Sequence, residues 1–326
     1  VARIAIAYDI RTRGTRQLVF SGDLLPWRVH TDTYLVIHAR TRYHYAGNMQ
    51  VIDRSVTLQN DGQLWVYFIG CGSAFSRRHN QTNLLIVKGE DHLLVDCGNS
   101  CDRGLRAAGL TVLDINDVLI THSHADHVGG LEELMLMNRY VAKKKPRIYI
   151  TPRYQRILWN QSLRGGAEMN ERREGKGLGF TDYWNVTRPR PMPHRTREAH
   201  EFSVGGIKIR TFRTRHYPEQ AESWSDAMYS VGLVIDERVV FSGDTQFDAQ
   251  LLSEIEPAGG AEHIFHDVQL FPGGIHASLE EIATLPESVR NRTSLVHYGD
   301  NFEEHQPRVE ELGFVGFARE GVIHEF

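Results

Sequence analysis

The run Thr-His-Ser-His-Ala-Asp-His at residues 121–127 constrains this 326-residue chain more than any other feature of its sequence. It places His122, His124, Asp126 and His127 within six positions. Neutral imidazole and carboxylate are ligands that zinc accepts, and four such residues rarely fall at this spacing by chance. The run therefore predicts a metal site.

The flanks of this run suggest how one short segment serves two metal ions. Residues 117–121 are an apolar strand candidate and residues 131–140 a helix candidate. In an extended stretch the first two histidines point the same way, and the turn allowed by Gly129 and Gly130 swings Asp126 and His127 to the other side. We expect two ligands for each of two metals.

Three later residues follow predicted strands and complete this ligand set. They are His216, Asp244 and His297. Alone, each has an ordinary interpretation as a core or surface histidine or as a turn aspartate. Their shared position at strand ends downstream of the histidine run favours ligands.

Strand and helix candidates divide the chain into two parts. Residues 65–326 hold two halves rich in βα units, which predicts an α/β domain with two sheets packed face to face and helices outside. Residues 1–64 are predicted to form a small β-rich appendage, with strands at 1–7, 17–20, 33–38 and 51–57. We expect the appendage to be an oligomer contact, in a homodimer, or a cover for a sheet edge.

Composition excludes several protein classes. A net charge of −4 disfavours a protein that coats nucleic acid, although a local basic groove remains compatible with it. Three cysteines form no disulfide framework, so we expect a reducing, cytoplasmic location. No apolar run reaches the roughly 20 residues that span a bilayer.

The arginine-rich stretch at residues 188–197 lies in a polar, irregular segment. A solvated loop is one interpretation. A lid that steers phosphate is the other, because the stretch leads into the strand before His216. Arg195 is our candidate for a substrate contact there.

From residue 65 onward the chain resembles the metallo-β-lactamase superfamily. The histidine run carries the resemblance, together with the strand and glycine loop at residues 68–74 and the segment 93–98, which carries the family's structural aspartate, Asp96. The resemblance implies an αββα sandwich. It also implies that Asp244 bridges two metals. No cysteine occupies any of the ligand positions, unlike in several true β-lactamases of the fold, which disfavours antibiotic hydrolysis. The implied ligands are His122, His124 and His216 for one metal, and Asp126, His127 and His297 for the other.

Two adjacent zinc ions (manganese or iron are alternatives) would generate a hydroxide nucleophile and stabilise an attacked oxyanion. Two Zn²⁺, two carboxylates and a hydroxide leave a charge of about +1, which suits an anionic phosphodiester. The same charge also fits a thioester or a lactone.

Within the superfamily, the chain is similar to the ribonuclease Z and cyclic-nucleotide phosphodiesterase branch. His216 and Asp244 are only 28 positions apart, too close for the tRNA-gripping arm of ribonuclease Z. The motif at residues 297–300 also departs from that enzyme. The resemblance thus points to compact relatives such as the anti-Pycsar phosphodiesterases, which act on cyclic nucleotides. A ribonuclease Z-like endonuclease acting on RNA, a lactonase or β-lactamase-type hydrolase, and a metal-binding protein without catalysis are the alternatives.

Catalytic roles are assigned to Asp126 and His266. We expect His266 to protonate the leaving oxygen, with His276 as the rival donor. Asp267 is not expected to orient His266, because neighbours on a strand face opposite ways. Ser73 and His276 join Arg195 as expected substrate contacts.

Overall fold

The computed structural model describes residues 7–12, 15–20, 42–44, 50–53 and 56–326, and before residue 56 only the backbone of its strands. Contacts divide the chain into two compact units, residues 1–40 and 41–326. In the first unit, β1 (Ala7–Thr12) and β2 (Thr15–Phe20) form an antiparallel hairpin, as the sequence predicts for residues 17–20. The predicted strand at residues 33–38, and all but the last residue of the one at 1–7, lie outside the described residues.

One sheet of the second unit carries the histidine run. Its central strands are nearly continuous apolar runs, because both of their faces are buried. Its order is β12-β9-β8-β7-β6-β5-β21-β4-β3. The strands are β3 (Arg42–His44), β4 (Gln50–Asp53), β5 (Trp65–Gly70), β6 (Asn83–Lys88), β7 (Asp91–Val95), β8 (Asp117–Leu119), β9 (Arg147–Tyr149), β12 (Asn185–Thr187) and β21 (Val322–Glu325).

The other sheet carries the later ligand candidates. Its order is β13-β14-β15-β16-β17-β18-β19-β20. The strands are β13 (Arg190–Pro191), β14 (Ala199–Val204), β15 (Ile207–Arg213), β16 (Val231–Ile235), β17 (Val239–Phe241), β18 (His263–Asp267), β19 (Thr293–Val296) and β20 (Gly316–Phe317). A separate hairpin joins β10 (Arg172–Arg173) to β11 (Lys176–Gly177).

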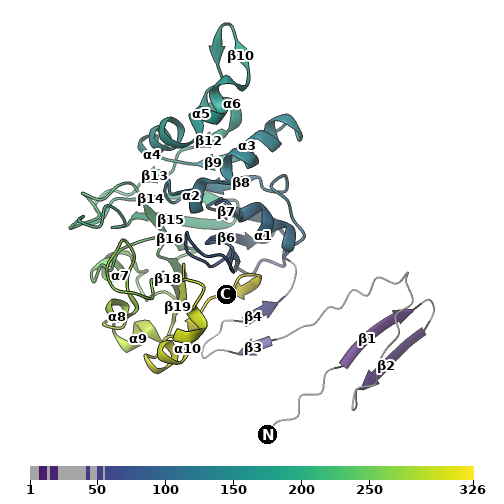
Figure 1. The fold of residues 1–326 in the computed structure, drawn as a ribbon, viewed down its shortest axis with the longest axis vertical. Coiled ribbons are helices and arrows are strands. Elements are labelled where there is room, and N and C mark those ends of the chain that lie inside the picture. The colour runs from purple at the N-terminus through teal and green to yellow at the C-terminus, as the bar shows by residue number, and fades with distance from the viewer. Residues whose placement is uncertain (1–6, 13–14, 21–41, 45–49, 54–55) are drawn as a thin grey trace. The chain divides into compact units, whose positions relative to one another are not determined.

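Helices cover the outer faces of both sheets (Figure 1). Those between β7 and β12 are α1 (Cys101–Ala107), α2 (Ala125–Val128), α3 (Leu131–Tyr140), α4 (Pro152–Ile157), a π-helical turn (Leu158–Leu163), α5 (Arg164–Ala167), a 3₁₀ turn (Glu168–Asn170) and α6 (Phe180–Tyr183). Those of the second half are α7 (Leu251–Ile255), α8 (Leu279–Ile282), α9 (Glu287–Arg290) and α10 (Phe302–Glu311). Among the described residues, no helix is long and apolar enough to cross a membrane.

Two apolar clusters hold these layers together. One fills the space between the sheets, where Phe68 of β5 contacts the rings of Phe241 and Phe265. The other packs the outer face of the first sheet against α1, α3 and α4. Helix, sheet, sheet and helix therefore form the predicted αββα sandwich.

The start of this unit differs from the prediction. We expected residues up to 64 to form an appendage, but β4 pairs antiparallel with β21 of the large sheet. The contact boundary accordingly falls at residue 40. Pairing between distant segments decides where β4 belongs, and the local sequence does not encode it.

Candidate metal centre

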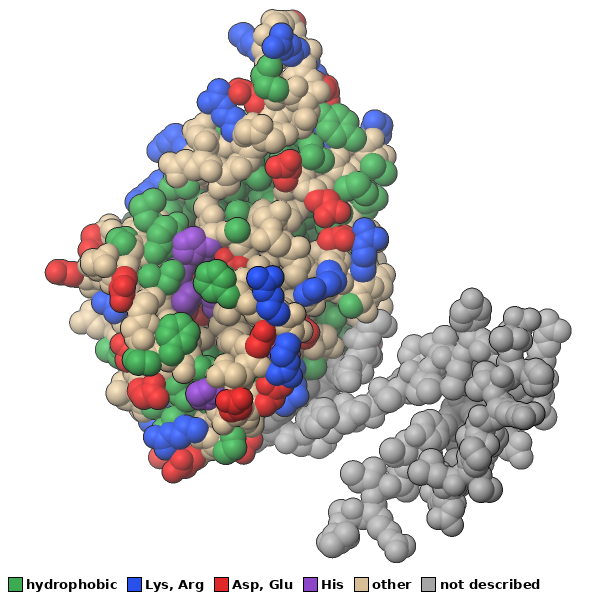
Figure 2. All heavy atoms as spheres, in the orientation of Figure 1, with side chains coloured by type: hydrophobic (Ala, Val, Ile, Leu, Met, Phe, Trp, Pro, Cys, Tyr) green, Lys and Arg blue, Asp and Glu red, His purple; other side chains and the backbone are tan. Residues whose placement is uncertain are grey.

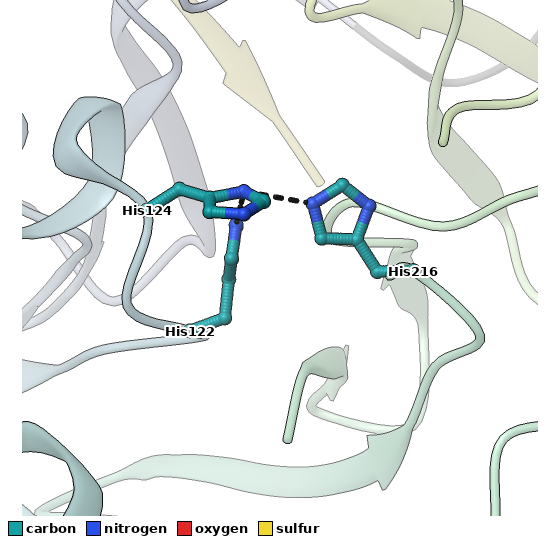
Figure 3. A group of neighbouring side chains, drawn as sticks. All are labelled: His122, His124 and His216. Carbon is teal, nitrogen blue, oxygen red and sulfur yellow. Dashed lines mark hydrogen bonds between the residues drawn. The ribbon is translucent and has the colours of Figure 1, made fainter. Parts of the chain in front are cut away.

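The first ligand group consists of His122, His124 and His216, whose rings converge (Figure 3). The Nδ1 atom of His124 lies 3.1 Å from the Nε2 atoms of both His122 and His216. Two atoms bound at ~2.0–2.1 Å to a tetrahedral zinc ion are about 3.3 Å apart. The spacing of these nitrogens therefore fits a shared ion.

Protonation supports the same interpretation. His216 Nδ1 donates to the carbonyl oxygen of Ile275 at 2.9 Å, so Nε2 of the neutral ring carries a lone pair. Burial lowers the pKa of His216 to about 3 and holds the pKa of His122 well below its usual range, so both rings are neutral at pH 7. Convergent neutral imidazoles are the form in which histidine binds a metal.

The second ligand group consists of Asp126, His127 and His297 with Asp244. Asp126 Oδ2 lies 3.2 Å from Nε2 of both His127 and His297. Asp244 Oδ2 lies 3.1 Å from His127 Nε2 and 3.3 Å from His297 Nε2. All four side chains are buried and their ligand atoms face one another.

Asp244 lies between the two groups. Its Oδ2 atom is also 3.8 Å from the Nε2 atoms of His122 and His216. Its Oδ1 atom is buried without a hydrogen-bond partner among the described residues. A buried carboxylate oxygen without a donor is costly, so this atom also fits a cation that it would bind.

Asp96 holds the second group from behind. The ring of His127 contacts Asp96 Oδ2 through Nδ1 at 2.7 Å, and Asp96 also accepts bonds from the amide and hydroxyl of Thr121. A carboxylate behind a ligand histidine fixes its tautomer and raises its basicity. Nearby, a Cβ at Gly98 would lie 1.8 Å from the carbonyl oxygen of Asp126, so only glycine fits there.

Charge in this group favours a cation. Burial lowers the pKa of His127, but Asp244, Asp126 and Asp96 outweigh it and hold that pKa well above its usual range. Burial raises the pKa of Asp126, yet the histidines beside it hold the net pKa well below the usual range. An ionised carboxylate is the form that binds metal.

His276 is the histidine that reaches this cluster, and His266 is not. His276 Nδ1 lies 2.9 Å from Asp267 Oδ2 and 3.9 Å from Asp244 Oδ2. Its ring is also 4.5 Å from that of His297, centroid to centroid.

The prediction for His266 therefore differs from the structure. This ring is buried, and its Nδ1 donates to the backbone oxygen of Asp267 at 2.8 Å. The Asp267 carboxylate, which we expected not to orient His266, contacts both rings, with Oδ1 3.3 Å from His266 Nδ1. It orients His276 across the turn that follows β18, a contact that strand alternation alone does not reveal.

The expected substrate contacts differ in their surroundings. Ser73 is half-buried, and its amide donates to the carbonyl oxygen of Tyr298, next to His297. Arg195 is exposed and makes no hydrogen bond or ion pair within the described part of the chain.

Other arginines of the 188–197 stretch have structural partners. Arg197 is 3% exposed and pairs with Asp248 and Glu254. Arg188 donates to the carbonyl oxygen of Ile150. The stretch also includes β13, which is paired at the edge of the second sheet. Paired backbone and arginines with structural partners give little support to the interpretation as a phosphate-steering lid.

The sequence pattern does not single out the aromatic side chains near the cluster. Tyr217 packs on His124, with ring centroids 4.4 Å apart. Phe75 and Phe271 are 90% and 63% exposed, on loops beside Tyr298 and before His276. Histidine side chains open onto the face shown in Figure 2, with hydrophobic side chains around them.

Comparisons with known proteins agree with this geometry. The family profile "Anti-Pycsar protein Apyc1" matches residues 64–324. Two relatives of that name, from Paenibacillus harenae and Bacillus phage vB_BsuM-Goe3, are 35% and 36% identical over 251 and 264 residues. These alignments cover 77% and 78% of this chain and 96% of each relative.

Among solved structures, the metallo-β-lactamase fold protein YhfI from Bacillus subtilis is similar with a TM-score of 0.58 and 15% identity, over 81% of this chain and 100% of that one. This likeness confirms the metallo-β-lactamase fold that the histidine run and the glycine loop predict. Because the family profile spans most of the chain, the protein belongs to the anti-Pycsar Apyc1 family.

Proposed function

We propose that this protein is a dinuclear metal-dependent phosphodiesterase that hydrolyses small cyclic nucleotides. The observation that carries the proposal is the position of Asp244, whose Oδ2 atom lies 3.1–3.8 Å from ligand nitrogens of both groups. The family membership and the resemblance to cyclic-nucleotide phosphodiesterases support the substrate class.

The two groups of converging side chains support the division of ligands that the resemblance implies. We assign His122, His124 and His216 to one zinc ion and Asp126, His127 and His297 to the other, with Asp244 between them. When bound, the two ions supply a hydroxide nucleophile at neutral pH and stabilise the negative charge of the attacked phosphate. Although burial raises the pKa of Asp126, the histidines beside it hold the net pKa well below the usual range, so its ionised carboxylate would help to hold the metal and would accept a hydrogen bond from that nucleophile.

His276 supplies the proton that the leaving oxygen needs. Opening a cyclic phosphodiester expels an alkoxide, which is a poor leaving group unless it is protonated. Asp267 accepts the Nδ1 proton of His276, which leaves Nε2 to hold and deliver a second proton. His276 thus replaces His266 as our proposed general acid.

Two exposed aromatic residues fit the rest of a nucleotide. Phe75 and Phe271 are exposed, the first two positions after Ser73, whose amide donates to Tyr298, and the second five positions before His276. Stacking of a base on an aromatic ring contributes about 1–3 kcal/mol and discriminates little between bases. We therefore expect several cyclic mononucleotides to be substrates.

A hydrolysis screen tests this function. The substrates are cyclic mononucleotides, cyclic dinucleotides, a precursor tRNA, a lactone and a β-lactam, each with wild-type protein and with the His122→Ala variant as a background control. The proposal expects hydrolysis of cyclic nucleotides that the variant lacks. Cleavage of the tRNA, the lactone or the β-lactam alone would replace it.

A further inference from the structure

A pocket lined by polar residues lies away from the metal centre. It has a volume of about 320 Å³ and is lined by Arg139, Tyr140, Lys143, Lys144, Lys145, Glu171 and Arg173. We refer to these seven residues as the basic pocket. It lies where the end of α3 meets the segment that leads to the β10–β11 hairpin. This is the end of the domain at which β10 is labelled in Figure 1, and Figure 2 shows Lys and Arg side chains there.

The sequence concentrates positive charge in this region. Residues 134–167 contain eight Lys and Arg residues and no Asp or Glu, although the whole chain has a net charge of −4. Three of the six lysines of the chain are consecutive at residues 143–145. Like charges placed together repel one another, so such a cluster requires a counter-charge from elsewhere.

Neutral groups hold several of these cations in place. Lys144 Nζ donates to the carbonyl oxygen of Leu113 at 2.7 Å and to Asn116 Oδ1 at 2.8 Å. Lys145 Nζ donates to the carbonyl oxygen of Thr181 at 2.7 Å. Carbonyl and amide oxygens position an ammonium group without neutralising it.

Carboxylates compensate only part of the charge. Arg139 pairs with Glu171 at 2.9 Å, and Arg173 lies 3.6 Å from Asp182. Within the described residues, the three lysines form no ion pair, and Lys143 makes no hydrogen bond through its side chain. Three lysines without a carboxylate partner among the described residues therefore line the pocket.

The basic pocket is separate from the metal centre. Lys145 lies two positions before β9, and Asn116, which holds Lys144, directly precedes β8, so the pocket adjoins the amino ends of these parallel strands. The histidine run follows the carboxyl end of β8. The ten residues of α3 separate Tyr140 from the metal-binding run by about 15 Å.

We propose that the basic pocket is an accessory binding site for an oligophosphate group, carried by inorganic polyphosphate or by a nucleoside triphosphate. Fixed ammonium groups around a compact pocket match several phosphate oxygens at once. Tyr140 is 37% exposed, so an aromatic side chain at the pocket is accessible to a base. This inference does not depend on the proposed hydrolytic function.

Calorimetric titration with tripolyphosphate and with a nucleoside triphosphate tests the proposal at physiological ionic strength. The test variant is Lys143→Ala/Lys145→Ala, and Lys208→Ala, an exposed lysine of β15, is the matched control. We expect saturable binding that the double variant weakens at least about tenfold, the value of one lost charge-assisted hydrogen bond. We expect Lys208→Ala to change it less than about twofold, within the effect usual for a surface charge. Hydrolysis of bis(p-nitrophenyl) phosphate should be unchanged in both variants, which separates this test from the test of the metal centre.

Comparing tripolyphosphate with the nucleoside triphosphate identifies which molecule carries the bound oligophosphate group. Tighter binding of the triphosphate, with the difference lost in Tyr140→Leu, assigns a nucleotide, and equal binding assigns the oligophosphate group alone. Absence of saturable binding would overturn the proposal. So would binding that persists in the double variant and disappears in Asp244→Ala, because the anion would then occupy the metal centre. Tight binding of single-stranded RNA that tripolyphosphate does not displace would also overturn it, in favour of a polymer-binding surface.

Discussion

At the scale of single residues, we propose that Asp244 is the side chain on which the metal centre depends most. It is the member of the cluster whose oxygen faces nitrogens of both ligand groups. Asp244→Asn keeps the shape of the side chain but removes its charge, so two metal ions would then face Asp126 as their only ligand carboxylate. We expect the variant to lose metal, measured by elemental analysis, and to lose hydrolysis at least 100-fold.

Asp61→Asn, an exposed turn residue, is the control for Asp244→Asn and should behave as wild type. Two bound metal ions and a near-normal rate in Asp244→Asn would refute its bridging position.

His276 and His266 offer a direct comparison, because both contact the carboxylate of Asp267. If His276 is the acid, His276→Ala should keep both metals yet lose roughly 10²–10⁴-fold in rate on a cyclic nucleotide. It should recover most of that rate on bis(p-nitrophenyl) phosphate, whose leaving group needs no proton. Within the described residues, the polar contacts of the His266 ring are with Asp267 alone, so His266→Gln should be affected less than about tenfold on either substrate. Equal losses on both substrates in His276→Ala would argue against the acid role.

These two histidines also show where sequence-based prediction ends. The run at residues 121–127 was predictable because its ligands are local and its spacing is rare. The choice between His266 and His276 was not, because it depends on how the turn after β18 folds back onto Asp267. The exposure of Phe75 likewise depends on packing that no local pattern records.

At the scale of elements, histidines buried in the two sheets should make the free energy of unfolding sensitive to acid. His263 on β18 and His324 on β21 are each 4% exposed, and burial lowers the pKa of both to about 3. In the unfolded chain this pKa is near 6.5. Between pH 6.5 and 3 the unfolded chain therefore binds protons that the folded chain excludes, so the free energy of unfolding falls as pH decreases.

The expected slope is at most about 1.4 kcal/mol per pH unit for each of these histidines below pH 6. Urea denaturation of His263→Gln/His324→Gln at pH 7, 6 and 5 should show a shallower loss of stability than wild type. His305→Gln, on the accessible surface of α10, should keep the wild-type slope. Identical slopes in wild type and the double variant would mean that these rings take up protons without cost.

The strand pattern explains how much of the fold was predictable. β5, β6 and β7 are apolar runs bounded by Gly, Asn and Asp turns, so their positions follow from the sequence. The pairing of β4 with β21 joins segments about 270 residues apart, and no local signal encodes it. The same holds for the π-helical turn at Leu158–Leu163, which directly follows α4.

At the scale of the whole molecule, we propose that the protein is a homodimer. The described part of residues 1–40 forms a two-stranded hairpin, and such a hairpin is at best marginally stable alone. Light scattering at micromolar concentration should give twice the chain mass of 37.2 kDa. A chain that begins at residue 41 should dissociate if residues 1–40 form the contact. A monomeric mass for the full chain would exclude the dimer.

We propose that the protein needs two bound metal ions to hydrolyse a cyclic phosphodiester. The most direct measurement is a titration of metal-depleted protein with zinc, in which the initial rate of cyclic mononucleotide hydrolysis is followed against bound zinc. We expect little activity at one equivalent, a steep rise to a plateau at two, and no activity at any ratio in Asp244→Asn. A full rate at one equivalent, or no hydrolysis with two bound ions, would contradict this claim.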